Sequence, residues 1–257
     1  MPRRSRQHQR QEKRKEEQTQ ILKRIAPKSE NQAKYFQSID VNSYTFVIGP
    51  PGTGKTFIAL WHGLKLLFDE NSPIERIAVI RPLVEVNNFD EKSLGALPGD
   101  SREKLAPWMG AILDSMREVM PEHEMNKLLA SKYIEFFNIA LCRGRSFVNT
   151  FVIIDESQNI TVEGDGMKML LTRLGEGSKM VIAGDLKQSD IGGRKGSALK
   201  DAIRKFNNER GFGVCLLEPK DIMRNKLISR ILEIYGDYNP NEPGIKLSDI
   251  IESKDKK

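Results

Sequence analysis

The strongest constraint on the fold is a string of eight residues, Gly49-Pro50-Pro51-Gly52-Thr53-Gly54-Lys55-Thr56, which matches the pattern G-x-x-x-x-G-K-[ST] in full. An apolar run, residues 45–48, comes directly before the string, and a segment of helix-forming residues begins at Phe57. Glycines let the backbone curl so that successive N–H groups point inward, and a helix start adds unpaired N–H donors and the positive end of a dipole. The string therefore predicts a strand, a phosphate-binding loop and a helix in direct succession.

The residues of this loop have distinct expected roles. The backbone of Gly49, Pro50, Pro51, Gly52, Thr53 and Gly54 is expected to surround the phosphates of ATP or a close nucleoside triphosphate. The Lys55 ammonium should reach the β- and γ-phosphates, and the Thr56 hydroxyl should ligate Mg²⁺. A glycine-rich turn that binds nothing is the structural alternative, but the strand and the helix that a phosphate loop needs are both indicated.

Short apolar runs alternate with longer amphipathic segments from Tyr44 onward. Near-continuous apolar runs are typical of strands that are covered on both faces, and alternating strands and helices indicate a parallel sheet. We predict one α/β domain of the P-loop NTPase class, with a parallel sheet flanked by helices. The expected strands are residues 44–48, 76–80, 133–137, 150–154, 179–183 and 213–217, and the expected helices are residues 56–70, 101–120, 164–174, 197–207 and 227–235.

Two adjacent carboxylates, Asp155 and Glu156, follow the apolar run of residues 150–154. Because a parallel sheet collects the ends of its strands at one edge, this pair should lie beside the phosphate loop. We expect Asp155 to hold Mg²⁺ through water and Glu156 to polarise the attacking water, since the carboxylate that is not committed to the metal stays free as a base. A solvated Asp-Glu turn is the structural alternative.

A third polar strand end follows residues 179–183, with the sequence Gly184-Asp185-Leu186-Lys187-Gln188. It places a carboxylate and an amide at the same edge of the predicted sheet. Gln188 is a candidate for a hydrogen bond to the γ-phosphate or to the attacking water, and a polar turn is the structural alternative.

Positive charge is concentrated at the N-terminus. Residues 1–24 contain nine Lys or Arg and three Glu, so their surplus of six equals the formal net charge of +6 of the whole chain. We divide the chain into a basic arm, residues 1–27, which is expected to be disordered, an ATPase domain, residues 28–238, and a polar C-terminal tail, residues 239–257. The arm is either a solvated segment or one that contacts the phosphates of nucleic acid.

Cysteine and histidine usage gives little sign of a metal or disulfide framework. Cys142 and Cys215 are the only cysteines, and with the three scattered histidines they form no zinc or disulfide spacing. No apolar stretch approaches the roughly 18–20 residues that span a bilayer, and the N-terminus lacks the apolar segment of a signal peptide. These features predict a soluble cytoplasmic protein without a membrane partner.

The order of the motifs resembles the PhoH family of P-loop ATPases. Two strings, L-G-x-L-P-G-D at residues 94–100 and D-E-x-Q-N at residues 155–159, are much more specific than the phosphate loop alone. The resemblance covers residues 31–235, about four-fifths of the chain. Besides the loop, it rests on Asn31-Gln32 and on residues 80–85, 94–100, 143–147, 155–159, 167–173, 184–185, 188 and 221–224.

The resemblance implies a core similar to the first RecA-like lobe of superfamily 1 helicases. By this likeness Gln32 would read the adenine edge, since an amide can donate and accept at once, and Arg224 would be an arginine finger, supplied to a neighbouring subunit. Some members of the family form rings, so a homo-oligomer is expected. Short stand-alone versions with a basic arm occur in bacteriophages as well as bacteria, which would place a phage-encoded chain in the host cytoplasm.

The chain departs from the family pattern at two places. Residues 86–93 form a longer connection than the pattern has, and residues 189–192 lack the proline expected two residues past the aspartate. The first departure bears on the loop before residue 94 and on any ligand that this loop touches.

The sequence as a whole predicts Mg²⁺-dependent ATP hydrolysis, coupled to the binding of RNA or other single-stranded nucleic acid. Arg81, Arg143 and Arg145 fit either surface ion pairs or contacts with phosphate or RNA. A nucleotide-dependent interaction switch, with slow turnover and no unwinding, is the alternative function. A small-molecule kinase fits less well, because no acceptor-site signature is present and the acid pair suits water as acceptor. Unwinding would need a second RecA-like wall, which we expect a neighbouring subunit to supply.

Overall fold

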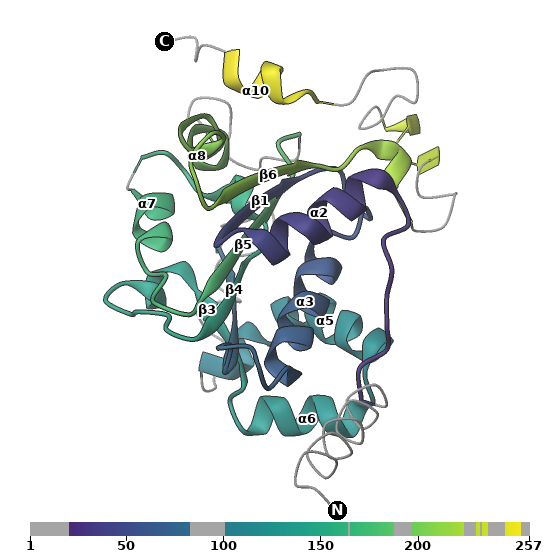
Figure 1. Cartoon of the computed structure of the whole chain (residues 1–257), viewed down its shortest axis with the longest axis vertical. Coiled ribbons are helices and arrows are strands. Elements are labelled where there is room, and N and C mark those ends of the chain that lie inside the picture. Colours follow the sequence, from purple (N-terminus) through teal and green to yellow (C-terminus); the bar gives the residue numbers. More distant parts are fainter. Residues whose placement is uncertain are drawn as a thin grey trace, which may run out of the picture.

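A computed structural model describes residues 21–82, 101–163, 165–187, 197–223, 230, 231, 233–235 and 245–252, with only the backbone described for residues 101–108. Its centre is a six-stranded sheet in the order β3-β2-β4-β5-β1-β6, and all neighbouring strands are parallel. The expected α/β class, a parallel sheet flanked by helices, is confirmed (Figure 1). The strands are β1 (Tyr44–Ile48), β2 (Arg76–Arg81), β3 (Ile134–Asn138), β4 (Thr150–Ile154), β5 (Lys179–Gly184) and β6 (Phe212–Leu216).

Helices cover both faces of this sheet, so that the domain has three layers (Figure 1). Side chains alternate between the two faces along each strand. In β4, Phe151 and Ile153 join one core, while Val152 and Ile154 join the other. The first core is closed by α2 (Glu30–Val41), α3 (Lys55–Phe68), α5 (Ser101–Val119) and α6 (Glu122–Ala130), and the second by η1 (Ile139–Cys142), α7 (Gly166–Leu171), α8 (Ala198–Phe206) and α10 (Leu247–Glu252).

Three of the α-helices, α2, α6 and α10, and the short 3-10 helix η1 are not among the helices expected from the sequence. Helix α2 begins after Ser29, whose hydroxyl accepts the Gln32 N–H, and it buries Tyr35 and Ile39. Its apolar stripe is narrow, which explains why the hydrophobic pattern alone did not indicate it. Of the helix expected at residues 227–235, only residues 230, 231 and 233–235 are described.

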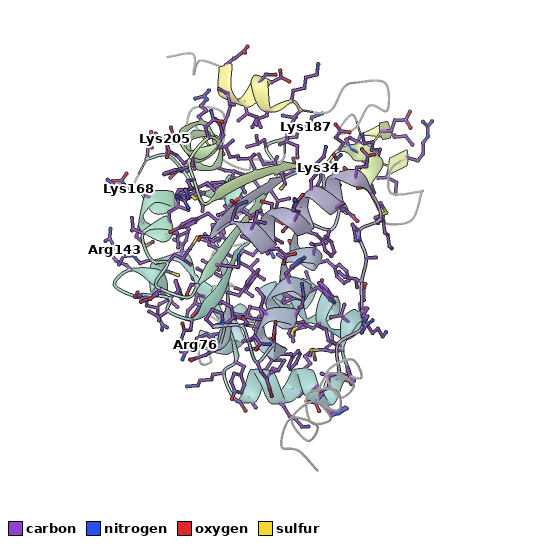
Figure 2. The ribbon with its side chains drawn as sticks, viewed as in Figure 1. Lys34, Arg76, Arg143, Lys168, Lys187 and Lys205 are labelled. Atoms are coloured by element: carbon purple, nitrogen blue, oxygen red, sulfur yellow. The ribbon has the colours of Figure 1, made fainter. Side chains whose placement is uncertain are left out.

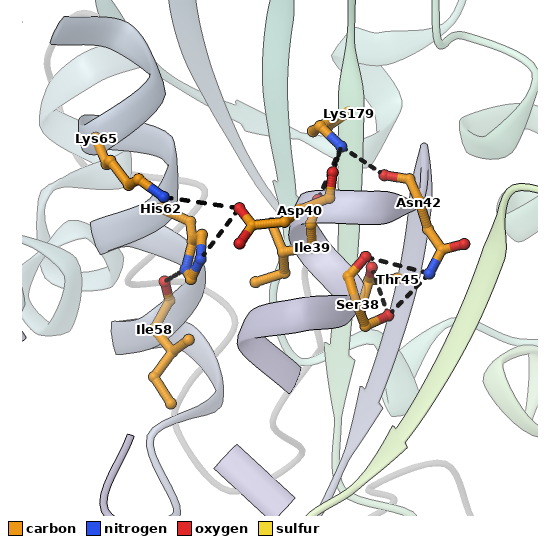
Figure 3. Close-up of polar contacts among 9 residues, drawn as sticks. All are labelled: Ser38, Ile39, Asp40, Asn42, Thr45, Ile58, His62, Lys65 and Lys179. Carbon is orange, nitrogen blue, oxygen red and sulfur yellow. Dashed lines mark hydrogen bonds and ion pairs between the residues drawn. The ribbon is translucent and has the colours of Figure 1, made fainter. Parts of the chain in front are cut away.

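The end of α2 is fixed by a lysine from the sheet (Figure 3). The Lys179 ammonium, at the start of β5, donates to the carbonyl groups of Ile39, Asp40 and Asn42 at 2.8, 2.9 and 2.8 Å. The last carbonyls of a helix have no partner within it, and a cation there complements the negative end of the dipole. Lys179 therefore both ends α2 and holds it against the sheet.

The surface of the domain carries basic side chains along the edge where η1, α7 and α8 lie. Figure 2 shows Arg143, Lys168 and Lys205 pointing outward there. Lys205 pairs with Asp201 at 2.6 Å, one helical turn earlier. Within the described part of the chain, no helix has both the length and the apolar character needed to cross a membrane.

Candidate functional site

The phosphate loop joins the end of β1 to the start of α3, as the sequence predicts. Gly54, at the N-cap of α3, has a φ of 88°, a left-handed conformation that glycine adopts without strain. Gly49 has no room for a side chain, because a Cβ there would lie 2.6 Å from the Leu217 carbonyl oxygen, just after β6. The loop is therefore a tight turn whose glycines are required by its geometry.

The side chains of the loop help to hold its shape. The Lys55 ammonium donates to the carbonyl groups of Gly49 at 2.6 Å and Pro50 at 3.0 Å. The Thr53 hydroxyl donates to the same Pro50 carbonyl at 2.8 Å. From α2, the buried Tyr35 hydroxyl donates to the Lys55 carbonyl at 2.9 Å, and burial raises the pKa of this phenol well above its usual value. A protonated Tyr35 thus anchors the first residue of α3.

Thr56 and Asp155, two residues expected to serve one metal ion, are in direct contact. The Thr56 hydroxyl donates to the Asp155 carboxylate at 2.7 Å. Asp155 follows β4, with β5 lying between β4 and the strand that leads into the loop. Burial raises the pKa of the Asp155 carboxyl, and the hydrogen bond from Thr56 and the charge of Lys55 oppose that rise. The sheet thus brings the hydroxyl and the carboxylate together from positions 99 residues apart.

This pair suits Mg²⁺ more than other metals. Hydroxyl and carboxylate oxygens are hard ligands, and Mg²⁺ takes few ligands from protein while keeping waters and phosphate oxygens. No cluster of three or more His, Cys, Asp or Glu side chains that would hold a metal alone occurs among the described residues. The donor set fits a metal ion that arrives with a phosphate ligand.

Glu156 is held in an unusual backbone conformation at the same edge. Its φ is 52° and its ψ is 37°, a left-handed conformation that is uncommon for a residue with a Cβ. One carboxylate oxygen lies 3.4 Å from the Arg81 guanidinium at the end of β2, and the other accepts a hydrogen bond from the Gln158 amide at 2.6 Å. Both partners fix the direction in which this carboxylate points.

Gln158 joins the acid pair to the neighbouring strand end. Its amide oxygen accepts the backbone N–H of Asp185 at 3.0 Å, and its side chain is only 1% exposed. Burial raises the pKa of the Asp185 carboxyl, which accepts the Lys187 N–H at 2.9 Å. Gln188, the candidate sensor of the γ-phosphate, lies outside the described residues.

A cavity of about 790 Å³ lies beside the loop, within the size range of small-molecule sites. Phosphate-loop residues and the first turn of α3 line it together with Arg81, Asp155 and Glu156. Its remaining wall comes from Gln32 and Phe36 of α2, from Ala111, Ser115 and Glu118 of α5, from Met223, and from residues 24–28. The acidic strand end, the phosphate loop and a wall of mixed apolar, polar and charged side chains therefore face one space.

Residues 21–28, which we call the strap, form part of this wall although the sequence assigned most of them to the basic arm. Leu22 is buried in the core of the helical layer. The Lys23 N–H donates to the Val119 carbonyl of α5 at 2.7 Å, and the Trp61 indole of α3 donates to the Lys23 carbonyl at 2.8 Å. The strap is thus bonded to two helices before it passes the cavity.

Comparison with known proteins agrees with this arrangement. The profile of the family described as "PhoH: PhoH-like protein" matches residues 24–236. The chain belongs to the PhoH family. It is 37% identical to a PhoH-like protein of Mycobacterium leprae over 223 residues, 36% identical to one of Bacillus subtilis over 217 residues, and 33% identical to Protein PhoH of Escherichia coli over 214 residues. These matches cover 87%, 84% and 82% of this chain, but only 62%, 66% and 58% of the relatives.

Another string of the PhoH resemblance, at residues 221–224, is tied to the phosphate loop. The Met223 N–H donates to the Gly52 carbonyl at 3.0 Å. The fully buried Asp221 carboxylate accepts from the Asn31 amide at 2.8 Å and from the Glu218 N–H at 2.7 Å. Arg224, the candidate arginine finger, lies outside the described residues, directly after this anchored turn.

The other arginines singled out in the sequence lie in two places. Arg81 reaches the site through Glu156. Arg143 and Arg145 lie in the exposed turn after η1, and the Arg145 guanidinium stacks 4.5 Å from the centre of the Phe137 ring. The turn is therefore a surface feature of this PhoH-like chain, separate from the residues that line the cavity.

Two parts of the site were not foreseen from the sequence: the strap and the positioning contacts of Gln158. Ser29 and Gln32 do match the S/T-x-x-E/Q pattern of a capping box, which marks a helix start and would have indicated α2. Gln158 belongs to the D-E-x-Q-N string, but that string does not indicate its contacts, which depend on the left-handed turn at Glu156.

Proposed function

We propose that this PhoH-like protein is a Mg²⁺-dependent ATPase. The observation that carries the proposal is the 2.7 Å contact between Thr56 and Asp155, beside a loop that already holds Lys55. Loop, hydroxyl and carboxylate are the parts that phosphoryl transfer needs to position a triphosphate and its metal ion. The neighbouring Glu156 adds a second carboxylate that is not bonded to the metal-site hydroxyl.

In this proposal each group has one task. The loop N–H groups and the Lys55 ammonium bind the phosphates, and Thr56 with Asp155 holds Mg²⁺. When bound, the ion neutralises charge on the phosphate oxygens. Glu156 accepts a proton from the attacking water, and Arg81 and Gln158 keep its carboxylate oriented. ATP is the proposed nucleotide because the family resemblance points to ATP.

The test is phosphate release from ATP with and without Mg²⁺, for wild type and for Lys55→Ala. Losing a charge that stabilises the transferring phosphoryl group should lower the rate on the order of a hundredfold or more. Lys34→Ala, which removes an exposed lysine of α2, is the matched control and should leave the rate unchanged. Equal rates for wild type and Lys55→Ala would contradict the proposal.

A nucleotide-dependent interaction switch is the second candidate, and one observation favours it. Both carboxylate oxygens of Glu156 are engaged, by Arg81 and by Gln158. A protein whose catalytic base is held by two partners would hydrolyse ATP slowly until a further event released the carboxylate. Tight ATP binding together with slow hydrolysis that RNA does not stimulate would select the switch.

We further propose that hydrolysis is coupled to RNA or other single-stranded nucleic acid. The helicase-like order of motifs and the nine Lys or Arg among residues 1–24 support this coupling. A neighbouring copy of the chain would supply Arg224 and the opposite wall of the cavity. Phosphate release measured with added RNA and with added single-stranded DNA, on protein whose mass in solution is known from light scattering, tests both points. A monomer whose rate neither polymer changes would refute them.

A further inference from the structure

Arg81 is the last residue of β2, and the sheet places it beside the acid pair. The Asp155 N–H donates to the Ile80 carbonyl at 2.9 Å, so the chain segments that follow β2 and β4 leave the sheet side by side. The Arg81 Nη2 lies 3.4 Å from the Glu156 carboxylate. Among the described residues, the guanidinium makes no other ion pair or hydrogen bond.

The Arg81 guanidinium can serve a second acceptor while it contacts Glu156. Arginine carries five N–H donors in one plane, and the contact with Glu156 uses few of them. The two side chains are 36% and 38% exposed, so water screens their pair and holds it weakly. Phosphate oxygens are stronger partners for arginine, because two parallel N–H bonds can form to them. Arg81 can therefore bind a phosphate without releasing the carboxylate.

The cavity beside the phosphate loop is the place where such a phosphate would arrive. Among the described residues four basic side chains line it, and Arg24 and Lys28 of these belong to the strap. The other two, Lys55 and Arg81, come from the start of α3 and the end of β2. Burial raises the pKa of the Asp155 carboxyl, and the charges of Arg81 and Lys55 both lower it. Two cations from separate elements thus act on the carboxylate that is proposed to hold Mg²⁺.

A second, smaller cavity beside Arg81 offers its charge no alternative anion. Asp155 is the only other charged residue in the described lining of that cavity. The rest of the lining is apolar and consists of Val79, Met109, Ile112, Phe136 and Phe137. Because a charge is costly to place against apolar groups, the guanidinium is favoured on the side of the acid pair and the phosphate loop.

We propose that Arg81 is a catalytic residue, which binds the terminal phosphate group of ATP while it orients Glu156. The inference deepens the proposed ATPase function and rests on it. Lys55 and Arg81 together stabilise the negative charge that spreads over the terminal phosphate oxygens in the transition state. As the oxygen of the attacking water bonds to phosphorus, its proton passes to Glu156 and ADP leaves with the electrons of the broken bond. ADP lacks the terminal phosphate, so it leaves Arg81 in contact with Glu156 alone.

The test compares ADP with the β,γ-imido analogue of ATP, which carries the terminal phosphate group but is not hydrolysed. In calorimetric titrations with Mg²⁺, Arg81→Ala should weaken the analogue tenfold or more and ADP less than twofold. Phosphate release from ATP should fall on the order of a hundredfold. Arg76→Ala is the matched control, because this exposed arginine begins the same strand, roughly 16 Å away along it. It should change neither the affinities nor the rate.

A second set of variants separates contact with the phosphate from support of the base. In Glu156→Gln the ion pair with Arg81 is absent, so a residue that acts only through Glu156 has no effect in this background. Adding Arg81→Ala to Glu156→Gln should still weaken the analogue tenfold or more and spare ADP. Equal weakening of both nucleotides, or unchanged affinity for the analogue in this background, would overturn the inference.

The outcomes also separate this inference from the function on which it rests. A wild-type protein that binds neither nucleotide, or that does not hydrolyse ATP with Mg²⁺, would contradict the proposed function itself. A wild-type protein that does both, with an Arg81→Ala variant that keeps the same preference for the analogue over ADP, would contradict only the role of Arg81. If circular dichroism shows that Arg81→Ala is unfolded, Arg81→Gln replaces it, because it keeps a donor without the charge. The same selective loss is then required.

Discussion

His62 makes the stability of the domain sensitive to mild acid. It lies on α3, fully buried, with its ring edge against Phe36 and Trp61 at centroid distances of 4.7 and 5.2 Å (Figure 3 shows its polar contacts). The Ile58 carbonyl, 3.2 Å from Nδ1, can only accept, so the neutral ring carries its proton on Nδ1. Among the described residues Nε2 has no hydrogen-bond partner, and the Asp40 carboxylate is 3.8 Å away.

Burial lowers the pKa of His62 from 6.5 to about 4, against the raising effects of the Ile58 carbonyl and Asp40, and Lys65 and Lys179 lower it further. The unfolded chain therefore binds a proton between pH 6.5 and 4 that the folded chain does not. Stability from this group is present above pH 6.5 and is lost as the pH falls toward 4. With these two values the loss between pH 7.5 and pH 5 is about 2 kcal/mol.

Urea unfolding at pH 7.5 and pH 5, followed by circular dichroism, measures this loss against a variant without an imidazole. His62→Met fits irregular apolar space and does not titrate. Its free energy of unfolding should fall less than that of wild type over the same pH interval, by about 2 kcal/mol. The comparison cancels the contributions of Asp155, Asp185 and the other shared groups. His123→Met, at an exposed position, should behave as wild type. Equal losses for wild type and His62→Met would refute the assignment.

The remaining predictions concern the site and the arm. Glu156→Gln should still bind ATP but hydrolyse it on the order of a hundredfold more slowly. Filter binding measures the affinity and phosphate release measures the rate; rapid hydrolysis by this variant would show that Glu156 is not the base. Gln158→Leu should lower kcat on the order of tenfold with little change in ATP affinity, since it only orients Glu156; an unchanged kcat would make the contact structural. Gly49→Ala should cost about 1–3 kcal/mol in urea unfolding, because its Cβ would meet the Leu217 carbonyl at 2.6 Å; full stability would mean that the loop can shift. Deleting residues 1–20, which leaves the strap intact, should lower RNA affinity and flatten its salt dependence; identical binding curves would make the arm inert.

The strands were predicted well because they are buried on both faces. β4 is buried at all five positions, and its predicted ends coincide with the observed ones, as do those of β1. The other strands differ by a residue at one or both ends. Helix α6 was missed because only Met125 and Leu128 of its nine residues are buried, too few to give a helical period.

Some contacts of the site were also predictable from the sequence, and others were not. The proximity of Thr56 and Asp155 could be predicted from the sequence, because the loop that follows β1 and the residue that follows β4 lie at the same edge of a parallel sheet. The strap could not be predicted from the sequence, because it is held by individual hydrogen bonds such as the one from the Trp61 indole to the Lys23 carbonyl. Such bonds give no periodic pattern in the sequence. The hydrogen bonds of Gln32 to Lys28 and Thr53 could not be predicted either, since the sequence does not show which main-chain groups a side-chain amide will contact.

The phosphate loop is closed by residues that are synthesised long after the loop itself. Asn31 and Asp221, which are hydrogen-bonded to each other, are 190 positions apart. The Gly52 carbonyl accepts from the Met223 N–H, and Gly49 lies against Leu217. A nascent chain that ends before β6 would carry every residue of the nucleotide motif without the walls that shape it. Contacts of such long sequence separation form slowly, because the long loop between the partners must close first. Capture of nucleotide would therefore report that the whole domain, from the strap to the turn after β6, has been completed.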